Sequence, residues 1–286
     1  MNQPFVSNAI WKSFLYKDIT RPYSKLLYRG THMKKHKDKK LFAFDLDKTL
    51  AESKQPMDDE MAELLRRFLE RVNVAVISGG SFAQFQKQFV PKLSSGKLES
   101  LFLFPTCGSA FYRYGKNGWE NVYTEALSPE DKSRILLAFE KMFAEVGFVR
   151  PETVYGELIE DRDTQITFGA YGSTAPLHLK SVWDPDRAKR LKMIEVLAKL
   201  IPEFEIRTGG TTSIDVTRKG IDKAYGMRQM EKHLNIPMHE MAFVGDDLGP
   251  GGNDHPVIAT GVAVIEVTDP EHTKRVIRSI LREQKL

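Results

Sequence analysis

The sequence predicts an α/β fold with a Rossmann-like, doubly wound parallel-sheet core and an α+β cap domain inserted between the two halves of that core. Apolar runs alternate with stretches of helical periodicity in residues 41–104 and again in residues 224–280, and this alternation is typical of parallel strands joined by helices. The middle of the chain instead carries hairpin and antiparallel-strand signals around two helices. We therefore expect the core in residues 37–108 and 219–286, and the cap in residues 109–218.

The first half of the core should hold three strands and two helices. Asp58 can cap the first of these helices, because the apolar residues that follow it recur at helical spacing up to Val72. The second helix is expected at residues 81–89. The strands are expected at residues 41–44, 74–77 and 101–104.

Turn and cap signals define the elements of the middle segment. The Gly-Lys-Asn-Gly sequence at residues 115–118 separates two β-type runs and predicts a hairpin. Ser128 and Pro129 suit the N-cap and the first position of a helix that ends at Gly147. A second helix should span about residues 184–202. Further strands are expected at residues 164–170, 204–207 and 213–216.

Length and composition agree with a two-module globular protein. A chain of 286 residues exceeds the common single-domain size, and a hydrophobic content of 41% with mixed charges is that of an ordinary soluble protein. The one cysteine, Cys107, excludes an intrachain disulfide and suits a reducing compartment. No apolar run approaches the roughly 20 residues that a spanning helix requires. We therefore expect a cytoplasmic protein without a membrane partner.

The net charge of +4 is unevenly distributed. Residues 1–40 carry ten Lys or Arg and two acids, a net +8, so the rest of the chain carries −4. The globular body is thus mildly acidic, and its charge gives no support to nucleic-acid binding.

The basic segment at residues 1–36 is open to several interpretations. Its composition is compatible with a targeting segment, although it lacks the long apolar centre of a secretory signal, and with a basic arm for an anionic surface. We favour two simpler interpretations: a loosely docked or disordered extension, or a translation start placed upstream of a native start at Met33.

Two aspartates one residue apart follow the first predicted strand. Asp45 and Asp47, with Thr49 two residues further on, occupy the loop after residues 41–44. Two close carboxylates repel each other unless a cation lies between them, so the pair indicates a hard metal, most simply Mg²⁺. One carboxylate can attack phosphorus while the other transfers a proton. The alternative is an ordinary acidic turn at a strand end.

A second group of acids follows another predicted strand near the end of the chain. The apolar run at residues 241–244 leads to Asp246, and Asn253 and Asp254 lie a few residues beyond it. Acids at the carboxyl ends of neighbouring parallel strands are a usual way to build a metal site in α/β proteins.

Two smaller signals lie between these groups. Ser78 and Gly79 end the strand at residues 74–77, where a hydroxyl and backbone N–H groups can hold phosphate oxygens. Lys223, or Lys219 one helical turn earlier, opens a helix and can neutralise a nucleophile and a phosphoryl group. Either signal alone is more often a plain turn or a solvated lysine, but their order along the chain favours a phosphotransferase.

These segments resemble the four motifs of the haloacid dehalogenase superfamily. Within it, the chain is most similar to the eukaryotic-type phosphomannomutases and the related class IIB sugar phosphatases. The likeness runs from about Leu41 to the C-terminus, and the inserted cap of these families closes over the sugar. The most similar segments are residues 77–81, 209–216, 250–255 and 268–275.

The resemblance implies a mechanism for the motif residues. Asp45 would be the nucleophile that forms an aspartyl-phosphate, and Asp47 the acid and base. Mg²⁺ would be held by Asp45, the main-chain carbonyl of Asp47, and Asp246. Asn253 and Asp254 would orient the metal's water or the lysine. The phosphoryl oxygens would be held by Ser78 and Lys223.

The resemblance leaves the substrate less defined. Cap arginines of the mutases bind the phosphate that is not transferred; Arg162 matches one such position, and Tyr155 and Ser173 occupy the other two. We therefore rank a Mg²⁺-dependent sugar-phosphate phosphatase above a phosphomannomutase, with a non-catalytic binding protein as a remote third. A small substrate, a hexose phosphate, is expected, and the cap's aromatic residues allow a homodimer.

Further residues are expected beside the substrate. Ser213 and Asp215 match positions that touch sugar hydroxyls in the family. Lys48 stands where the family usually has glycine. The remaining substrate-binding candidates are Thr49 and Gly79.

Overall fold

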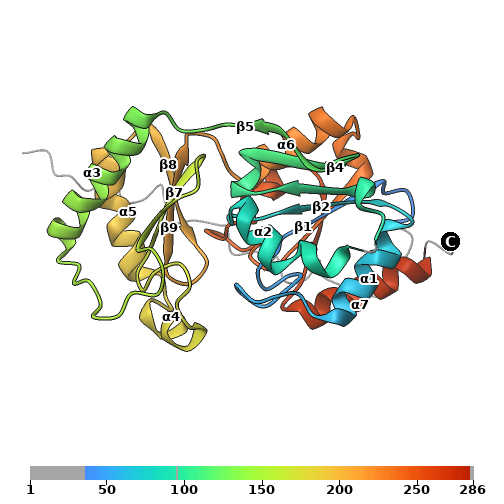
Figure 1. The fold of residues 1–286 in the computed structure, drawn as a ribbon, viewed down its shortest axis with the longest axis horizontal. Helices are drawn as coiled ribbons and strands as arrows, with labels where there is room; N and C mark the ends of the chain where they lie inside the picture. The colour runs from blue at the N-terminus through green and yellow to red at the C-terminus, as the bar shows by residue number, and fades with distance from the viewer. Residues whose placement is uncertain (1–35, 95, 284–286) are drawn as a thin grey trace, which may run out of the picture. The chain divides into compact units, whose positions relative to one another are not determined.

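The computed structural model describes residues 36–94 and 96–283, and its strands form two sheets (Figure 1). The interpretations of the basic N-terminal segment fall, apart from His36, outside the described residues. Among the residues that the structure does describe, no helix has both the length and the apolar character that a membrane span requires.

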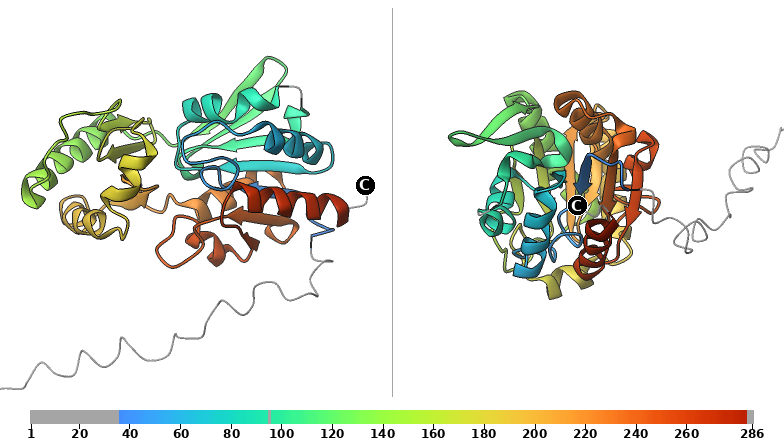
Figure 2. Two further views of the ribbon diagram at one scale, coloured as in Figure 1. Left: turned by 90° about the horizontal axis from the view of Figure 1, so that it is seen from below. Right: turned by 90° about the vertical axis from the view of Figure 1, so that its right-hand side faces the viewer.

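The larger sheet has seven strands in the order β11-β10-β1-β2-β3-β4-β5. Its five strands from β11 to β3 are mutually parallel, whereas β4 and β5 are antiparallel additions at one edge. The two halves of this sheet come from opposite ends of the described chain and lie side by side (Figure 2). The strands are β1 Leu41–Phe44, β2 Asn73–Ile77, β3 Leu101–Phe104, β4 Ala110–Gly115, β5 Gly118–Thr124, β10 Met241–Gly245 and β11 Ala263–Glu266.

Helices cover both faces of the larger sheet. Alternate residues of β1 point to opposite faces, so Phe42 packs with the cluster around α1 and α7, while Leu41 packs with the cluster around α6. Figure 1 shows α6 on the side opposite α1 and α7. This is the doubly wound α/β core that the sequence predicts. The helices are α1 Asp59–Leu69, α2 Phe82–Gln88, α6 Lys223–Leu234 and α7 Pro270–Glu283.

The smaller sheet is antiparallel, with the strand order β6-β7-β9-β8. It shares an apolar core with α3 and α5, which includes Phe139, Phe168 and Leu197. As predicted, Ser128 caps α3, and Gly147 ends it at a positive φ of 67°. The elements are α3 Pro129–Val146, β6 Ile159–Asp161, β7 Gln165–Gly169, α4 Leu177–Trp183, α5 Ala188–Leu200, β8 Phe204–Gly209 and β9 Ser213–Arg218.

The hairpin expected in the cap belongs instead to the larger sheet. β4 pairs with β3, and the ring of Phe111 stacks on that of Phe104 with centroids 4.5 Å apart. A tight turn at residues 106–108 reverses the chain and returns it to its own sheet. The placement of residues 110–124 in the cap was therefore wrong, and we propose that the cap comprises residues 125–218.

Short 3₁₀ segments complete the described structure. They connect the strands and helices of the larger sheet, and none of them belongs to the smaller one. They are η2 Val90–Leu93, η3 Leu98–Ser100, η4 Thr106–Gly108, η5 Met238–Glu240 and η6 His255–Thr260.

Candidate active site

Three neighbouring parallel strands deliver polar residues to one edge of the larger sheet. β1 lies between β2 and β10, so Asp45, Ser78 and Asp246, which directly follow these strands, emerge at the same edge. Lys223, the first residue of α6, reaches the same place. The folding of four distant segments thus assembles the predicted motif.

Lys223 is enclosed between two carboxylates. Its Nζ lies 2.5 Å from Oδ1 of Asp45 and also donates to Asp254. Lys223 and Asp254 are both fully buried. Burial lowers the pKa of Lys223, but the two carboxylates outweigh this and hold the pKa above its usual value, so the ammonium stays charged. Lys219, by contrast, is exposed and donates to the carbonyl of Pro202 at 3.3 Å.

Three acids are close enough to share a cation. One carboxylate oxygen from each of Asp45, Asp246 and Asp254 lies within 4.8 Å of the others. Burial raises the pKa of Asp45 well above its usual value, and burial, followed by the charge of Asp254, raises that of Asp246 to about 6. The buried Oδ1 of Asn253 has no hydrogen-bond partner among the described residues. Crowded acids and an unpaired amide oxygen fit a hard divalent ion such as Mg²⁺.

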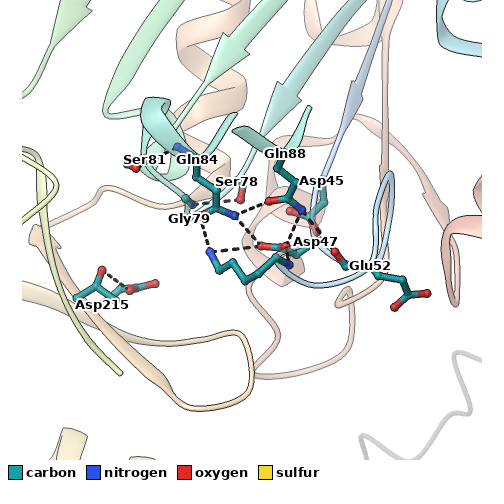
Figure 3. A network of polar contacts seen from close by, with 12 residues as sticks. Asp45, Asp47, Glu52, Ser78, Gly79, Ser81, Gln84, Gln88 and Asp215 are labelled. Carbon is teal, nitrogen blue, oxygen red and sulfur yellow. Dashed lines mark hydrogen bonds and ion pairs between the residues drawn. The ribbon is translucent and has the colours of Figure 1, made fainter. Parts of the chain in front are cut away.

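Asp47 is not one of these three acids, and a network of polar contacts surrounds its carboxylate (Figure 3). Its Oδ1 accepts from the backbone N–H of Lys54 at 2.7 Å and from Gln88 at 3.1 Å, and its Oδ2 accepts from Gln84 at 3.4 Å. The ammonium of Lys54 lies 3.7 Å from Oδ2. Burial raises the pKa of Asp47, but Lys54 and these hydrogen bonds outweigh it, and the net pKa is lowered. The carboxylate of Asp47 is therefore ionised at neutral pH.

The loop after β2 offers donors for phosphate oxygens. Ser78 is buried, and its Oγ accepts from the N–H of Gly80 at 3.1 Å, which leaves its own proton free to donate. Ser81 then caps α2. Figure 3 shows this loop beside Asp45 and Asp47.

The smaller sheet contacts this loop through two side chains. Arg162 donates to the carbonyl of Gly79 at 2.7 Å, and Gln165 donates to the same oxygen at 3.1 Å. The other nitrogens of Arg162 bind Glu160 at 2.6 and 3.0 Å. Arg162, predicted to bind substrate, therefore also joins the cap to the core.

A cavity of about 130 Å³ lies between the strand ends and the smaller sheet. It brings together most of the predicted residues. Thr49 is an exception: it is buried away from the cavity and donates to Asp246 at 3.3 Å, so the structure does not place it beside the substrate. The predicted residues that line the cavity are Asp45, Asp47, Ser78, Gly79, Arg162, Ser213, Asp215, Asp246 and Asn253.

Asp215 is a partly buried acid on the side of the cavity that the smaller sheet forms. It lies on β9, where the hydroxyl of Thr167 donates to its Oδ1 at 2.8 Å. Burial raises its pKa, although the charge of Arg162 opposes this. A carboxyl group of this kind is suited to hydrogen bonding with a sugar hydroxyl.

Several residues at the site were not found by the sequence analysis, and four of them lie at or near Asp47 and the cap side of the cavity. Gln84 and Gln88 are one helical turn apart on α2, and this spacing was the one signal available for them. The other two are Lys54 and Lys180, which line both this cavity and an adjoining one of about 320 Å³.

The two candidate lysines can be separated by mutation. We expect Lys223→Ala to lower kcat by at least about a hundredfold, because it removes the buried ammonium that faces the nucleophile. Lys219→Ala should leave kcat within about twofold, since that side chain is exposed. Steady-state phosphate transfer in both variants measures this, and a large loss in the Lys219 variant would contradict the assignment.

Comparisons with known proteins identify the family of the chain. The sequence profile described as eukaryotic phosphomannomutase matches residues 61–283, which begin after the Asp45 loop. The phosphomannomutase of Saccharomyces cerevisiae is 23% identical over 252 residues, 86% of this chain and 96% of its own length. Human phosphomannomutase 1 is 26% identical over 255 residues, 86% of this chain and 94% of its own.

Solved structures share the fold. The N-terminally truncated IMP-nucleotidase of Plasmodium falciparum superposes with a TM-score of 0.66 at 17% identity, covering 87% of this chain and 72% of its own. A haloacid dehalogenase-like hydrolase from Bacteroides thetaiotaomicron superposes with a TM-score of 0.57 at 16% identity, covering 85% and 99%. The chain belongs to the eukaryotic phosphomannomutase family.

Proposed function

We propose that this protein is a Mg²⁺-dependent phosphomannomutase, which interconverts mannose 1-phosphate and mannose 6-phosphate by way of a hexose 1,6-bisphosphate. The observation that carries this proposal is the cavity that contains Asp45 and Asp47: its wall also includes five basic residues, of which Lys54, Arg162 and Lys180 line the adjoining cavity as well. A mutase needs a nucleophile at one end of its site and positive charge for a second phosphate at the other. The names of the relatives support the same activity.

In the proposed reaction, Asp47 transfers the protons and Asp45 carries the phosphoryl group. The sugar hydroxyl loses its proton to Asp47 and attacks phosphorylated Asp45, so the bond from phosphorus to the aspartyl oxygen breaks and a bisphosphate forms. The bisphosphate then reorients in the site so that its other phosphoryl group faces Asp45, and Asp45 attacks that group. Asp47 then returns the proton to the departing sugar oxygen, and the enzyme is phosphorylated again.

Charge control falls to three further groups. Lys223 neutralises Asp45 before attack, and Ser78 can donate to an oxygen of the transferring group. Mg²⁺, when held by Asp45 and Asp246 with Asn253 nearby, supplies positive charge to the phosphoryl group in transfer. Enclosure by the cap favours transfer to a sugar over transfer to water.

A sugar-phosphate phosphatase is the second candidate. One observation favours it: the guanidinium of Arg162 is already bound by Glu160 and by the carbonyl of Gly79. In that case water replaces the sugar hydroxyl, and Asp47 takes its proton. The cap would then need no site for a second phosphate.

One assay with two readouts separates these candidates. Mannose 1-phosphate, hexose 1,6-bisphosphate and Mg²⁺ are mixed with the enzyme, and both mannose 6-phosphate and free phosphate are followed. We expect isomerisation to exceed phosphate release by at least about tenfold, which is ~1.4 kcal/mol between the two acceptors. Phosphate release without isomerisation would establish the phosphatase instead.

A further inference from the structure

Lys180 is a largely buried lysine that lines two cavities. It lies on α4, and 8% of its surface is exposed. Its ammonium has neither a hydrogen-bond acceptor nor an ion-pair partner among the residues that the structure describes. Holding a charge in that state costs free energy, and burial, followed by the charge of Lys54, lowers the pKa of Lys180. No hydrogen bond or ion pair within the described residues therefore accounts for a lysine at this position.

The two other cations that line both cavities already bind protein groups. Lys54 donates to Gln84 at 2.5 Å and lies 3.7 Å from a carboxylate oxygen of Asp47. Arg162 is bound by Glu160 and by a backbone carbonyl. Of these three cations, Lys180 is the one that makes no hydrogen bond or ion pair with another described residue, although the charge of Asp47 acts on it and partly offsets the lowering of its pKa.

The position of Lys180 fits an anion at the far end of a substrate. It lines the cavity that contains Asp45, and it also lines the adjoining cavity of about 320 Å³. Ser173 and Thr174 line that second cavity together with Lys180 and can offer hydroxyl groups to an anion there. A molecule with one phosphoryl group at Asp45 can therefore extend to Lys180.

We propose that Lys180 binds the phosphate group that is not being transferred. This assignment rests on the proposed mutase function, in which each substrate carries such a group. The positive charge then comes from α4, and not from the two cap positions that Tyr155 and Ser173 occupy. Lys180 would thereby restore a second-phosphate site on a cap that has one matching arginine.

The test compares two substrates that differ in this group. p-Nitrophenyl phosphate must place its one phosphate at Asp45, whereas mannose 1-phosphate reacts with phosphorylated Asp45 and must place its own phosphate at the far end. The quantity measured is kcat/KM for mannose 1-phosphate divided by kcat/KM for p-nitrophenyl phosphate. We expect Lys180→Met to lower this ratio at least about tenfold, mainly through KM, and Lys180→Arg to restore most of it.

Lys87→Met provides the matched control. Lys87 is an exposed lysine that lines the same 320 Å³ cavity, so its replacement removes equal charge nearby. We expect it to leave the ratio within about twofold. An equal fall in both variants would assign the effect to the general charge of the cavity and overturn the role of Lys180.

Stability gives a readout that separates binding from a structural role. Because no described residue pairs with the ammonium of Lys180, Lys180→Met should leave the melting temperature unchanged or raise it. A lower melting temperature with equal losses on both substrates would show a structural role and refute the proposal.

The failure of this proposal is distinguishable from the failure of the proposed function. If the wild-type enzyme isomerises mannose 1-phosphate and the Lys180→Met ratio equals that of the wild type, the assignment is wrong and the mutase stands. If the wild type does not isomerise, the mutase is wrong. Calorimetry with glucose 1,6-bisphosphate then tests the role of Lys180 separately. Tighter binding by the wild type than by Lys180→Met supports a phosphate site at Lys180, and equal binding overturns it.

Discussion

Asp45→Asn should abolish turnover and leave the fold intact. The amide has the size of the carboxylate and keeps an oxygen for Lys223, which lies 2.5 Å from Asp45 Oδ1. It cannot attack phosphorus, because it lacks the anionic oxygen. We expect kcat to fall by at least about 10⁴-fold, or ~5 kcal/mol of activation free energy.

Asp47→Asn is the matched control for the nucleophile. It changes a carboxylate in the same loop, but p-nitrophenol is a good leaving group that needs no proton. The Asp47 variant should therefore accept a phosphoryl group from p-nitrophenyl phosphate and retain it, since the base for the next step is missing. Mass spectrometry after rapid acid quenching should find phosphorylated Asp45 in that variant and none in Asp45→Asn. Substantial turnover by Asp45→Asn, or phosphate on another residue, would refute the mechanism.

The strand-end residues of this site could be predicted because topology alone brings them together. Once residues 41–44, 73–77 and 241–245 are recognised as parallel neighbours, Asp45, Ser78 and Asp246 must emerge at one edge. That argument needs only alternation and burial, both of which are visible in sequence.

Lys54 and Lys180 could not be predicted, since tertiary contacts alone place them. Lys54 reaches Asp47 through a loop that folds back, so that its backbone N–H donates to the carboxylate seven residues earlier. Lys180 lies on α4, a helix of seven residues without a side-chain cap, too short to show helical periodicity. Its proposed role is inferred from the absence of a hydrogen bond or ion pair to its ammonium among the described residues, and a sequence alone does not show such contacts.

The misplaced hairpin has a backbone cause. The chain turns back from β3 through Thr106 and Cys107, whose φ angles are 48° and 57°. Residues with a side chain rarely adopt positive φ, so neither residue signals a turn in the sequence. The hairpin itself was predicted correctly at residues 115–118, but nothing local assigned it to the larger sheet.

Asp184→Ala should cause a large loss of stability. Its Oδ2 lies 2.7 Å from Nε of Arg190, and the two side chains are 0% and 2% exposed. Removing the carboxylate leaves a buried guanidinium without its counter-charge, which costs about 3–5 kcal/mol of unfolding free energy. Arg190 also donates to the carbonyls of Gly209 and Gly210, directly before the cavity residues of β9. The loop that contains Gly209 and Gly210, which line the cavity, should loosen along with the fold.

Urea denaturation measures this loss, with Glu203→Ala as the matched control. Glu203 pairs with Arg134 on the surface, with side chains 39% and 57% exposed, so its loss should cost less than about 1 kcal/mol. A comparable loss in both variants would contradict the structural role of the buried pair.

Acidification provides an independent check on the same pair. Burial raises the pKa of Asp184, but its hydrogen bonds to Arg190 and to two backbone N–H groups outweigh this, so the pKa is lowered. A lowered carboxyl pKa contributes stability above the unfolded value of about 3.9 and loses it as the pH falls through the folded value. The difference in unfolding free energy between the wild type and Asp184→Ala should therefore shrink below about pH 4. If this difference in unfolding free energy stays constant on acidification, packing and not the charge of Asp184 holds the loop of Gly209 and Gly210 in place.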